Sequence, residues 1–242
     1  MIRADSWKCW ARQLRDDSTA RTLMPWELVI FDCDGVLVDS ELLSNRVLAQ
    51  MLAEIGLPMS LDETIATFMG HTLPACIALI EERTARPIPP TFVAAFRDRT
   101  FDIFRRELRP VRGIEAVLDA IDGPFCVASS GPPEKIALTL GITGLLRRFA
   151  GHIFSAAEVE RGKPHPDLFL HAARRMGAAP SHCVVIEDSV LGVQAGVAAG
   201  MHVFGYADLT AADALAGAGA LVFRSMEDLP QLLRDGRRPA SE

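Results

Sequence analysis

Acidic, hydroxyl and amine side chains follow four short apolar runs of this sequence, each near the point where the run ends. They are Asp32 and Asp34 after the first run, Ser129, Ser130 and Gly131 after the second, Lys163 in the loop beyond the third, and Glu187 and Asp188 after the fourth. Ligands of an open parallel sheet bind at the carboxyl ends of its strands. If the four runs are neighbouring parallel strands, these groups therefore meet at one edge of the sheet.

Four carboxylates at one sheet edge repel one another unless a cation lies among them. Two unit charges about 4 Å apart cost about 4 kcal/mol at an effective dielectric constant of 20. A short set of oxygen ligands suits Mg²⁺, which keeps several waters and binds substrate phosphate oxygens. Histidine and thiolate ligands are absent from these positions, which argues against zinc. We therefore expect Mg²⁺ as the cofactor, with Lys163 as a further positive charge for an anionic substrate.

The apolar pattern also predicts the elements that would position these groups. Residues 27–31, ELVIF, form a run typical of a buried parallel strand. Residues 41–109 show helical spacing without a strand-like segment, and strands alternate with helices after Pro110. This alternation predicts an α/β fold with a Rossmann-like parallel sheet core and an inserted all-helical cap domain. The later strands are expected at residues 124–130, 152–156, 183–188, 201–206 and 220–223, the last of them at a sheet edge.

These patterns divide the chain into three parts. The core domain is expected to comprise residues 25–40 and 110–235, and the helical cap domain residues 41–109. Residues 1–24 mix charges without a strand pattern, and we expect them to form a poorly ordered extension.

Composition excludes several classes of partner. The chain of 242 residues is 49% hydrophobic and 23% charged, which is typical of a soluble globular protein. Its formal charge of -6 argues against nucleic acid and anionic membranes, since both bind basic faces. No apolar stretch reaches the ~18 residues of a membrane span. Five cysteines without CxxC spacing are typical of reduced thiols, so we expect a cytoplasmic location.

Four motifs in order resemble those of a known superfamily. FDCDGVLVDS resembles the first motif of the haloacid dehalogenase superfamily, DxDGxxxD in its phosphatases, and SSG, GKPHPD and VVIEDSVLGVQAG resemble the second, third and fourth. The resemblance covers about residues 27 to 230. The helical insert resembles the small cap of the phosphoglucomutase-like and phosphoglycolate-phosphatase-like subgroup. Within that subgroup, the FDCDG…VDSE opening is most similar to bacterial 6-phosphogluconate-type sugar phosphatases.

The resemblance implies catalytic roles for four residues of the motifs. Asp32 would be the nucleophile that forms an aspartyl-phosphate. Asp34 would be the general acid/base, protonating the leaving oxygen and then deprotonating the hydrolytic water. Ser129 would bind the phosphoryl group, and Lys163 would bridge the nucleophile and the phosphate.

The remaining motif residues would bind metal or phosphate. Asp188 is expected to bind Mg²⁺ together with Asp32 and the backbone carbonyl of Asp34, and Glu187 to bind it directly or through water. Ser130 and Gly131 are expected to offer backbone N–H groups to the phosphate. A helix N-cap is the alternative role for Ser130.

The cap would close over the substrate and supply specificity contacts, with hinges near residues 39–41 and 109–113. Arg46 and His71 are the main candidates for these substrate contacts. A solvated helix position is the alternative for Arg46. The other cap candidates are Asn45, Gly70 and Thr72.

The cap also bears on the reaction. The β-phosphoglucomutase pattern has a histidine where this chain has Ser44, and an arginine where it has Leu73. We therefore expect a phosphatase that hydrolyses a small phosphorylated metabolite, such as a sugar or sugar-acid phosphate, as a monomer or weak homodimer. A phosphomutase and a non-catalytic phosphate-binding relative remain the alternatives.

Overall fold

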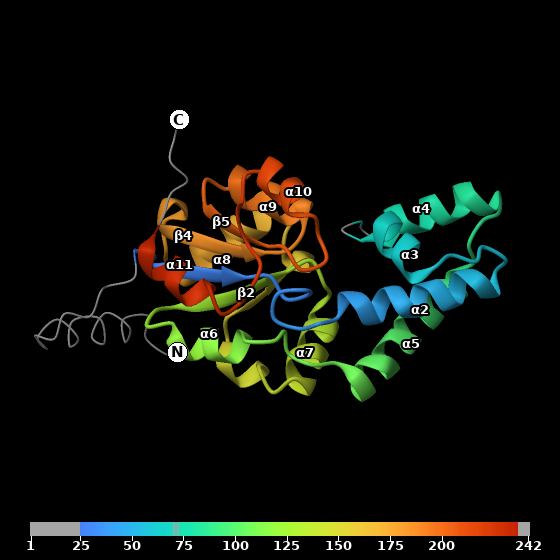
Figure 1. The fold of residues 1–242 in the computed structure, drawn as a ribbon, viewed down its shortest axis with the longest axis horizontal. Coiled ribbons are helices and arrows are strands. Elements are labelled where there is room, and N and C mark those ends of the chain that lie inside the picture. Colours follow the sequence, from blue (N-terminus) through green and yellow to red (C-terminus); the bar gives the residue numbers. More distant parts are fainter. Residues whose placement is uncertain (1–24, 70, 72, 237–242) are drawn as a thin grey trace, which may run out of the picture.

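The core of the protein is a parallel sheet (Figure 1). The computed structural model describes residues 25–69, 71 and 73–236, so the extension expected at residues 1–24 lies outside the described residues. In this part of the chain, six strands pair in the order β3-β2-β1-β4-β5-β6. They are β1 (Leu28–Phe31), β2 (Phe125–Ser129), β3 (Ile153–Ser155), β4 (Cys183–Glu187), β5 (His202–Tyr206) and β6 (Leu221–Phe223). Each lies within one residue of its predicted bounds, β6 is an edge strand as expected, and the predicted fold class is confirmed.

Strand β1 shows why the central strands are continuous apolar runs. All four of its residues are buried. Val29 and Phe31 belong to the hydrophobic cluster on one face of the sheet, whereas Leu28 and Ile30 belong to the cluster on the other face. Successive side chains of a strand point to opposite faces, so a sheet covered on both sides requires an apolar residue at every position.

Helices cover both faces of this sheet. Those whose apolar residues join the first cluster are α6 (Ile114–Ala120), α7 (Pro133–Ile142) and α11 (Leu229–Asp235). Those whose apolar residues join the second cluster are α8 (Asp167–Met176), α9 (Val190–Ala198) and α10 (Ala212–Gly217). Short 3₁₀ turns lie at Leu146–Phe149, Ala156–Glu158 and Pro180–His182. The arrangement is the three-layer form that alternating strands and helices predict.

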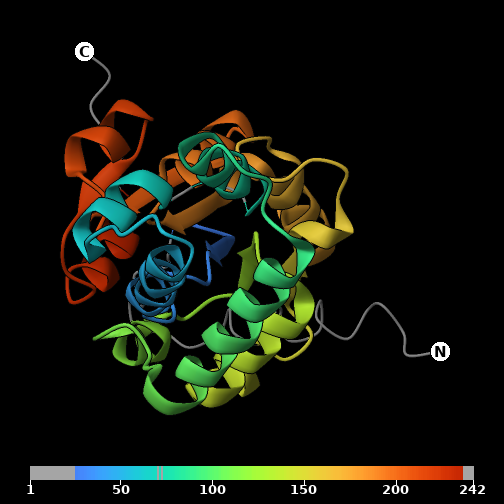
Figure 2. The ribbon, with the colours of Figure 1, turned by 90° about the vertical axis from the view of Figure 1, so that its right-hand side faces the viewer.

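A helical insert separates β1 from β2 along the chain. It consists of α2 (Glu41–Glu54), α3 (Leu61–Phe68), α4 (Leu73–Thr84) and α5 (Pro90–Glu107). Leu52, Ile80 and Phe104 are fully buried within it. Figures 1 and 2 show the insert standing beyond the carboxyl ends of the strands. Asp32 follows β1 at this end of the sheet. The all-helical character predicted for this region is confirmed.

The two chain segments that join the insert to the core run side by side. The N–H of Asp39 donates to the carbonyl of Arg109 at 3.0 Å, and the N–H of Val111 donates to the carbonyl of Leu37 at 3.0 Å. Val38 and Pro110 form an antiparallel bridge between these bonds. The insert is therefore attached through a short paired ribbon.

The described residues contain no single helix long and apolar enough to cross a membrane. Helices α3 and α4 reach that length and composition only as a pair bent by 120°.

Replacing Phe104 by alanine tests the packing of the insert. The side chain is 0% exposed, so the resulting cavity is expected to lower the free energy of unfolding by about 3–5 kcal/mol. Urea denaturation followed by circular dichroism measures this loss. Leu73→Ala is the control, because Leu73 is 43% exposed and its truncation is expected to cost less than about 0.5 kcal/mol. Equal losses in the two variants would contradict the packing described here.

Candidate active site

Three predicted site residues meet because their strands are neighbours. Phe31, the last residue of β1, pairs with Val127 of β2 and with Ile186 of β4. Asp32 follows β1 directly, while Ser129 and Glu187 end the two flanking strands. The parallel register thus brings these side chains to the same edge, as the sequence predicts.

Lys163 lies at the centre of this edge. Its Nζ is 2.5 Å from Asp32 Oδ1 and 2.5 Å from Glu187 Oε1, and it stands 5.0 Å from the ring centroid of Phe169. The lysine side chain is only 5% exposed. Burial would lower the pKa of Lys163, but the two carboxylates outweigh burial and raise that pKa. The lysine is therefore held in its charged form against Asp32.

Burial dominates the charge state of Asp32. It raises the pKa of this carboxyl to about 7, although the attraction of Lys163 acts in the opposite direction. The neighbouring charges of Glu187 and Asp34 raise the pKa further. Lys163 alone thus leaves the cluster of carboxylates short of positive charge.

Glu187 uses both of its oxygens within the protein. Oε1 accepts from Lys163, and Oε2 accepts from the N–H of Asp188 at 3.0 Å and from both the N–H and the hydroxyl of Ser189. A Cβ added at Gly192 would lie 1.8 Å from Oε1, so only glycine leaves room for this carboxylate. These contacts tie Glu187 to Lys163 on one side and to the backbone before α9 on the other. Metal ligation by Glu187 stays a prediction, and a bound metal would have to compete with these partners.

Asp188 is the carboxylate of this edge that most needs a cation. Burial raises its pKa well above the usual value, and repulsion from Glu187 and Asp32 raises it further. It faces Gly35, where an added Cβ would lie 2.0 Å from Oδ2 and where φ is +78°. Side chains other than glycine are thus excluded at Gly35 both by the carboxylate and by the left-handed backbone.

The residues at this edge fit a magnesium ion only if carbonyl and water oxygens complete its ligands. Among the described residues, no three His, Cys, Asp or Glu side chains are grouped so as to hold a metal by themselves. Both oxygens of Glu187 have partners within the protein, and Asp34 pairs with Lys135. Lys163 contacts Asp32 through Oδ1, so Asp32 and Asp188 are the candidate side-chain ligands. Two carboxylates with a backbone carbonyl and waters suit Mg²⁺, which commonly retains several waters in protein sites.

Asp34 has a set of partners that sequence reasoning missed. Its Oδ1 accepts from the hydroxyl of Ser40 at 2.6 Å and lies 2.9 Å from Lys135 Nζ. Burial would raise the pKa of Asp34, but Lys135 and Ser40 outweigh burial and lower it. The nearby Glu41 has a raised pKa because of burial and the charge of Asp34. A signal was available in the sequence, since a lysine in the first turn of a helix opposes the helix dipole and calls for an acidic partner.

The loop after β2 differs from the expected phosphate-binding loop in one detail. Ser129 is buried, and its hydroxyl oxygen accepts from the N–H of Gly131 at 3.0 Å. That N–H is thus already bonded, whereas the hydroxyl hydrogen of Ser129 is available to donate. Ser130 is exposed, and Pro132 occupies the N-cap position of α7, so the alternative role of Ser130 as a helix cap is not observed.

The structure does not test whether the predicted cap residues contact a substrate. Arg46 pairs with Glu107 of α5, and both side chains are about half exposed. His71 is exposed, and its N–H donates to the carbonyl of Phe68. Gly70 and Thr72 lie outside the described residues. Substrate contacts by Arg46 and His71 stay predictions, and for Arg46 they would require the pair with Glu107 to open.

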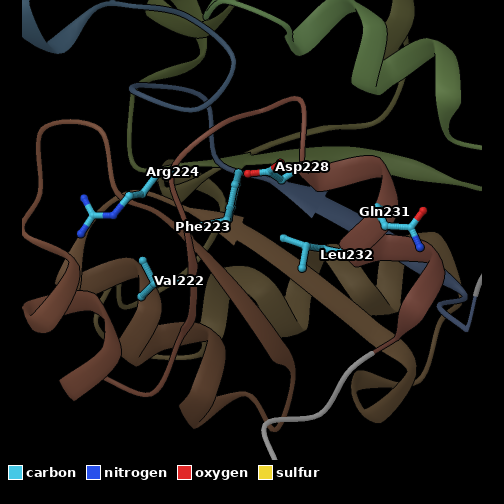
Figure 3. Close-up of a pocket in the computed structure, with 6 residues that line it drawn as sticks. All are labelled: Val222, Phe223, Arg224, Asp228, Gln231 and Leu232. Atoms are coloured by element: carbon cyan, nitrogen blue, oxygen red, sulfur yellow. The ribbon is translucent and has the colours of Figure 1, made fainter.

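A separate pocket lies away from these groups (Figure 3). It lies between β6 and α11 at an edge of the sheet, whereas Asp32 follows the central strand β1. Its lining includes none of the predicted site residues. The lining residues are Val222, Phe223, Arg224, Asp228, Gln231 and Leu232.

Comparison with known proteins identifies the family. The family model of the haloacid dehalogenase-like hydrolases matches residues 26–200, which is most of the chain. The chain belongs to this family. The 6-phosphogluconate phosphatase of Escherichia coli (strain K12) is 36% identical over 179 residues, covering 74% of this chain and 81% of the relative.

Solved structures of haloacid dehalogenase-like proteins agree with this assignment. A conserved protein of unknown function from Agrobacterium tumefaciens superposes with a TM-score of 0.80 at 35% identity, covering 87% of this chain and 99% of the other. A hydrolase of the family from Deinococcus radiodurans, solved with bound phosphate and sodium, gives a TM-score of 0.74 at 34% identity, covering 90% and 100%. The resemblance inferred from the motifs is confirmed, and with it the prediction of an enzyme, a hydrolase of phosphoric monoesters.

The raised pKa values predict a pH dependence of Mg²⁺ binding. With a pKa of about 7, Asp32 keeps its proton below that pH, and a binding metal ion must displace it. Calorimetric titration with Mg²⁺ is therefore expected to give an affinity at pH 6 at least about tenfold weaker than at pH 8. Asp188→Asn should bind Mg²⁺ weakly at both values. An affinity independent of pH in the unmodified protein would contradict this prediction.

A glycine-to-alanine pair tests the placement of Glu187. Gly192→Ala is expected to displace this carboxylate from Lys163 and to lower kcat/KM for phosphate release by about 10–100-fold, the usual range for supporting groups around a metal site. Gly141→Ala in α7 is the matched control, because an added Cβ there meets no atom within 4 Å. Steady-state kinetics on both variants decides the matter, and equal activities would show that Glu187 tolerates displacement.

Proposed function

We propose that this protein is a Mg²⁺-dependent phosphatase that hydrolyses small sugar or sugar-acid phosphates through an aspartyl-phosphate on Asp32. The main supporting observation is the buried contact between Asp32 and Lys163 at the carboxyl end of the central strand. A carboxylate held beside a cation at a sheet edge is positioned to meet a phosphoryl group. The relative that hydrolyses 6-phosphogluconate, by its name, supports the substrate class.

The first half of the reaction transfers the phosphoryl group to the protein. An Asp32 oxygen forms a bond to phosphorus while the bond from phosphorus to the leaving oxygen breaks. Asp34 must carry a proton at this point, against the lowered pKa that Lys135 and Ser40 give it, and it donates that proton to the leaving oxygen, which departs as an alcohol. Lys163 and the Ser129 hydroxyl hold the phosphoryl oxygens as charge builds on them.

The second half returns the nucleophile. Water attacks phosphorus, the bond to the Asp32 oxygen breaks, and Asp34 takes the proton of the attacking water. Inorganic phosphate leaves, and both carboxylates regain their initial states. Asp34 thus acts first as an acid and then as a base. Its carboxyl group must therefore reach both the leaving oxygen and the attacking water.

Asp32, Asp188 and the backbone carbonyl of Asp34 would hold the magnesium ion. Phosphatases of this family generally use Mg²⁺. When bound, the ion supplies positive charge that offsets the repulsion between the nucleophile and the phosphate. The fit rests on Asp188, whose raised pKa marks a buried negative charge without a sufficient counter-charge.

The helical insert would act as the cap domain that excludes water and selects the substrate. It stands over the carboxyl ends of the strands (Figure 2), and Arg46 and His71 would contribute contacts from it. Ser44 and Leu73 occupy the positions at which the mutase pattern has a histidine and an arginine. We therefore assign the phosphoryl group to water. A small metabolite as the partner, a cytoplasmic location and a monomer or weak homodimer complete the proposal.

Phosphate release from a panel of about a hundred phosphorylated metabolites, with and without Mg²⁺, tests the function. Asp32→Asn is expected to lower turnover by at least about 10³-fold, as loss of a covalent nucleophile does. Asp119→Asn is the matched control, because Asp119 is exposed, pairs with Arg148 and belongs to none of the four motifs. Unchanged turnover in Asp32→Asn would exclude the mechanism, and isomer interconversion without phosphate release in a coupled assay would favour a mutase.

A further inference from the structure

The carboxylates of the site are divided between two lysines. Lys163 contacts Asp32 and Glu187, whereas Lys135 contacts Asp34. Lys163 belongs to the third family motif, but Lys135 lies outside the four motif strings that identify the family. Its contact with the second aspartate therefore calls for an explanation of its own.

Helix α7 and the loop before it fix the path of the Lys135 side chain. The residue lies in the first turn of α7, where its N–H donates to the carbonyl of Pro132. An added Cβ at Gly131 would lie 3.5 Å from Lys135 Cδ, so the aliphatic stem passes against the loop after β2. The lysine thus spans the distance from the expected phosphate-binding loop to Asp34.

The helix dipole makes this an unfavourable position for a cation. The first turn of a helix carries partial positive charge, which favours acids there and disfavours lysine. Burial would also lower the pKa of Lys135, yet Asp34 and Glu41 outweigh burial and raise it. The lysine is therefore stabilised here by its acidic neighbours, and those neighbours belong to the site.

The contacts at Asp34 are asymmetric. Ser40 and Lys135 both contact Oδ1, and they reach it from different elements, the linker before α2 and the start of α7. Two donors on one oxygen fix the orientation of a carboxylate and direct its other oxygen elsewhere. The side chains of Lys135 and Asp34 are 23% and 16% exposed, so this arrangement is largely sheltered from water.

We propose that Lys135 is a positioning residue, which holds Asp34 by Oδ1 so that protons pass to the leaving oxygen and from the hydrolytic water at Oδ2. The inference rests on the proposed function and deepens it. Lys135 acts through Asp34 and makes no bond to the substrate. Replacing Lys135 should therefore lower the rate most for substrates whose leaving group must be protonated.

Leaving-group dependence separates this role from a structural one. An alkoxide leaving group needs the proton of Asp34, whereas 2,4-dinitrophenolate departs without one. Because kcat/KM covers the steps up to phosphorylation of Asp32, it reports the proton donation and not the later hydrolysis. The two substrates are the sugar phosphate turned over fastest in the panel above and 2,4-dinitrophenyl phosphate.

Lys135→Met is expected to lower kcat/KM for the sugar phosphate by about 10–100-fold, within the range of acid–base catalysis, and for the dinitrophenyl ester by less than about threefold. Lys135→Arg keeps a charged donor and should recover most of the loss. In an Asp34→Asn background, Lys135→Met should change kcat/KM by less than about twofold, because the carboxylate through which Lys135 acts is already absent. Thermal unfolding of each variant verifies the fold, and Lys135→Gln replaces Lys135→Met if the latter does not fold.

Three results would overturn the inference. They are equal losses on both substrates, no loss on the sugar phosphate, and additive losses in the Asp34→Asn background. Absence of turnover by the unmodified protein would instead overturn the proposed function, and this inference with it. The two failures are therefore distinguishable in one set of assays.

Discussion

Repulsion among buried carboxylates is the constraint on which the rest of this structure depends. A parallel sheet with strand order β3-β2-β1-β4-β5-β6 brings the residues after its central strands to one edge. Here those residues are largely acidic and buried, and each added negative charge raises the pKa of the others. Positive charge must enter the same small volume, and the folded chain supplies it through two lysines.

Each lysine reaches the edge from a different part of the core. Lys163 comes from the loop between β3 and α8, and Lys135 comes from the start of α7. Glycines then provide the space that charge pairing requires, because Gly35 accommodates Asp188 and Gly192 accommodates Glu187. The two lysines and the two glycines thus together allow four carboxylates to lie close to one another. Among the described residues neither lysine forms an ion pair with Asp188, and in the proposed function this is where Mg²⁺ would bind.

Much of the fold and part of the site could be predicted from the sequence. Strands such as β1 and β4 are buried on both faces, so their apolar runs have clear ends, and the acidic residues that follow them are easy to locate. The partners of these acids are harder to infer, because they depend on side-chain directions at the ends of helices. The position of Lys135 in the first turn of a helix hints at an acidic partner, but the sequence alone does not show that this partner is Asp34.

The same limit applies to Glu187 and Arg46. The sequence shows an acidic pair at the end of β4, but only the fold shows that the oxygens of Glu187 face Lys163 and the backbone of Ser189. Arg46 lies on a helix of the insert, where its partner Glu107 comes from 61 residues further along the chain. Contacts across such separations depend on how helices pack against one another, which periodicity does not encode.

The paired ribbon between the core and the insert has a consequence for folding and for evolutionary exchange. Because Asp39 and Arg109 are hydrogen-bonded neighbours, the insert leaves and re-enters the core at almost one point. For the core, the insert is equivalent to a loop whose two ends are held together by the ribbon. The entropic cost of closing such a loop rises only slowly with its length. Inserts of other sizes could therefore occupy this position while β1 and β2 keep their pairing. If the insert selects the substrate as proposed, the ribbon would allow that part to be exchanged without rebuilding the core that carries Asp32.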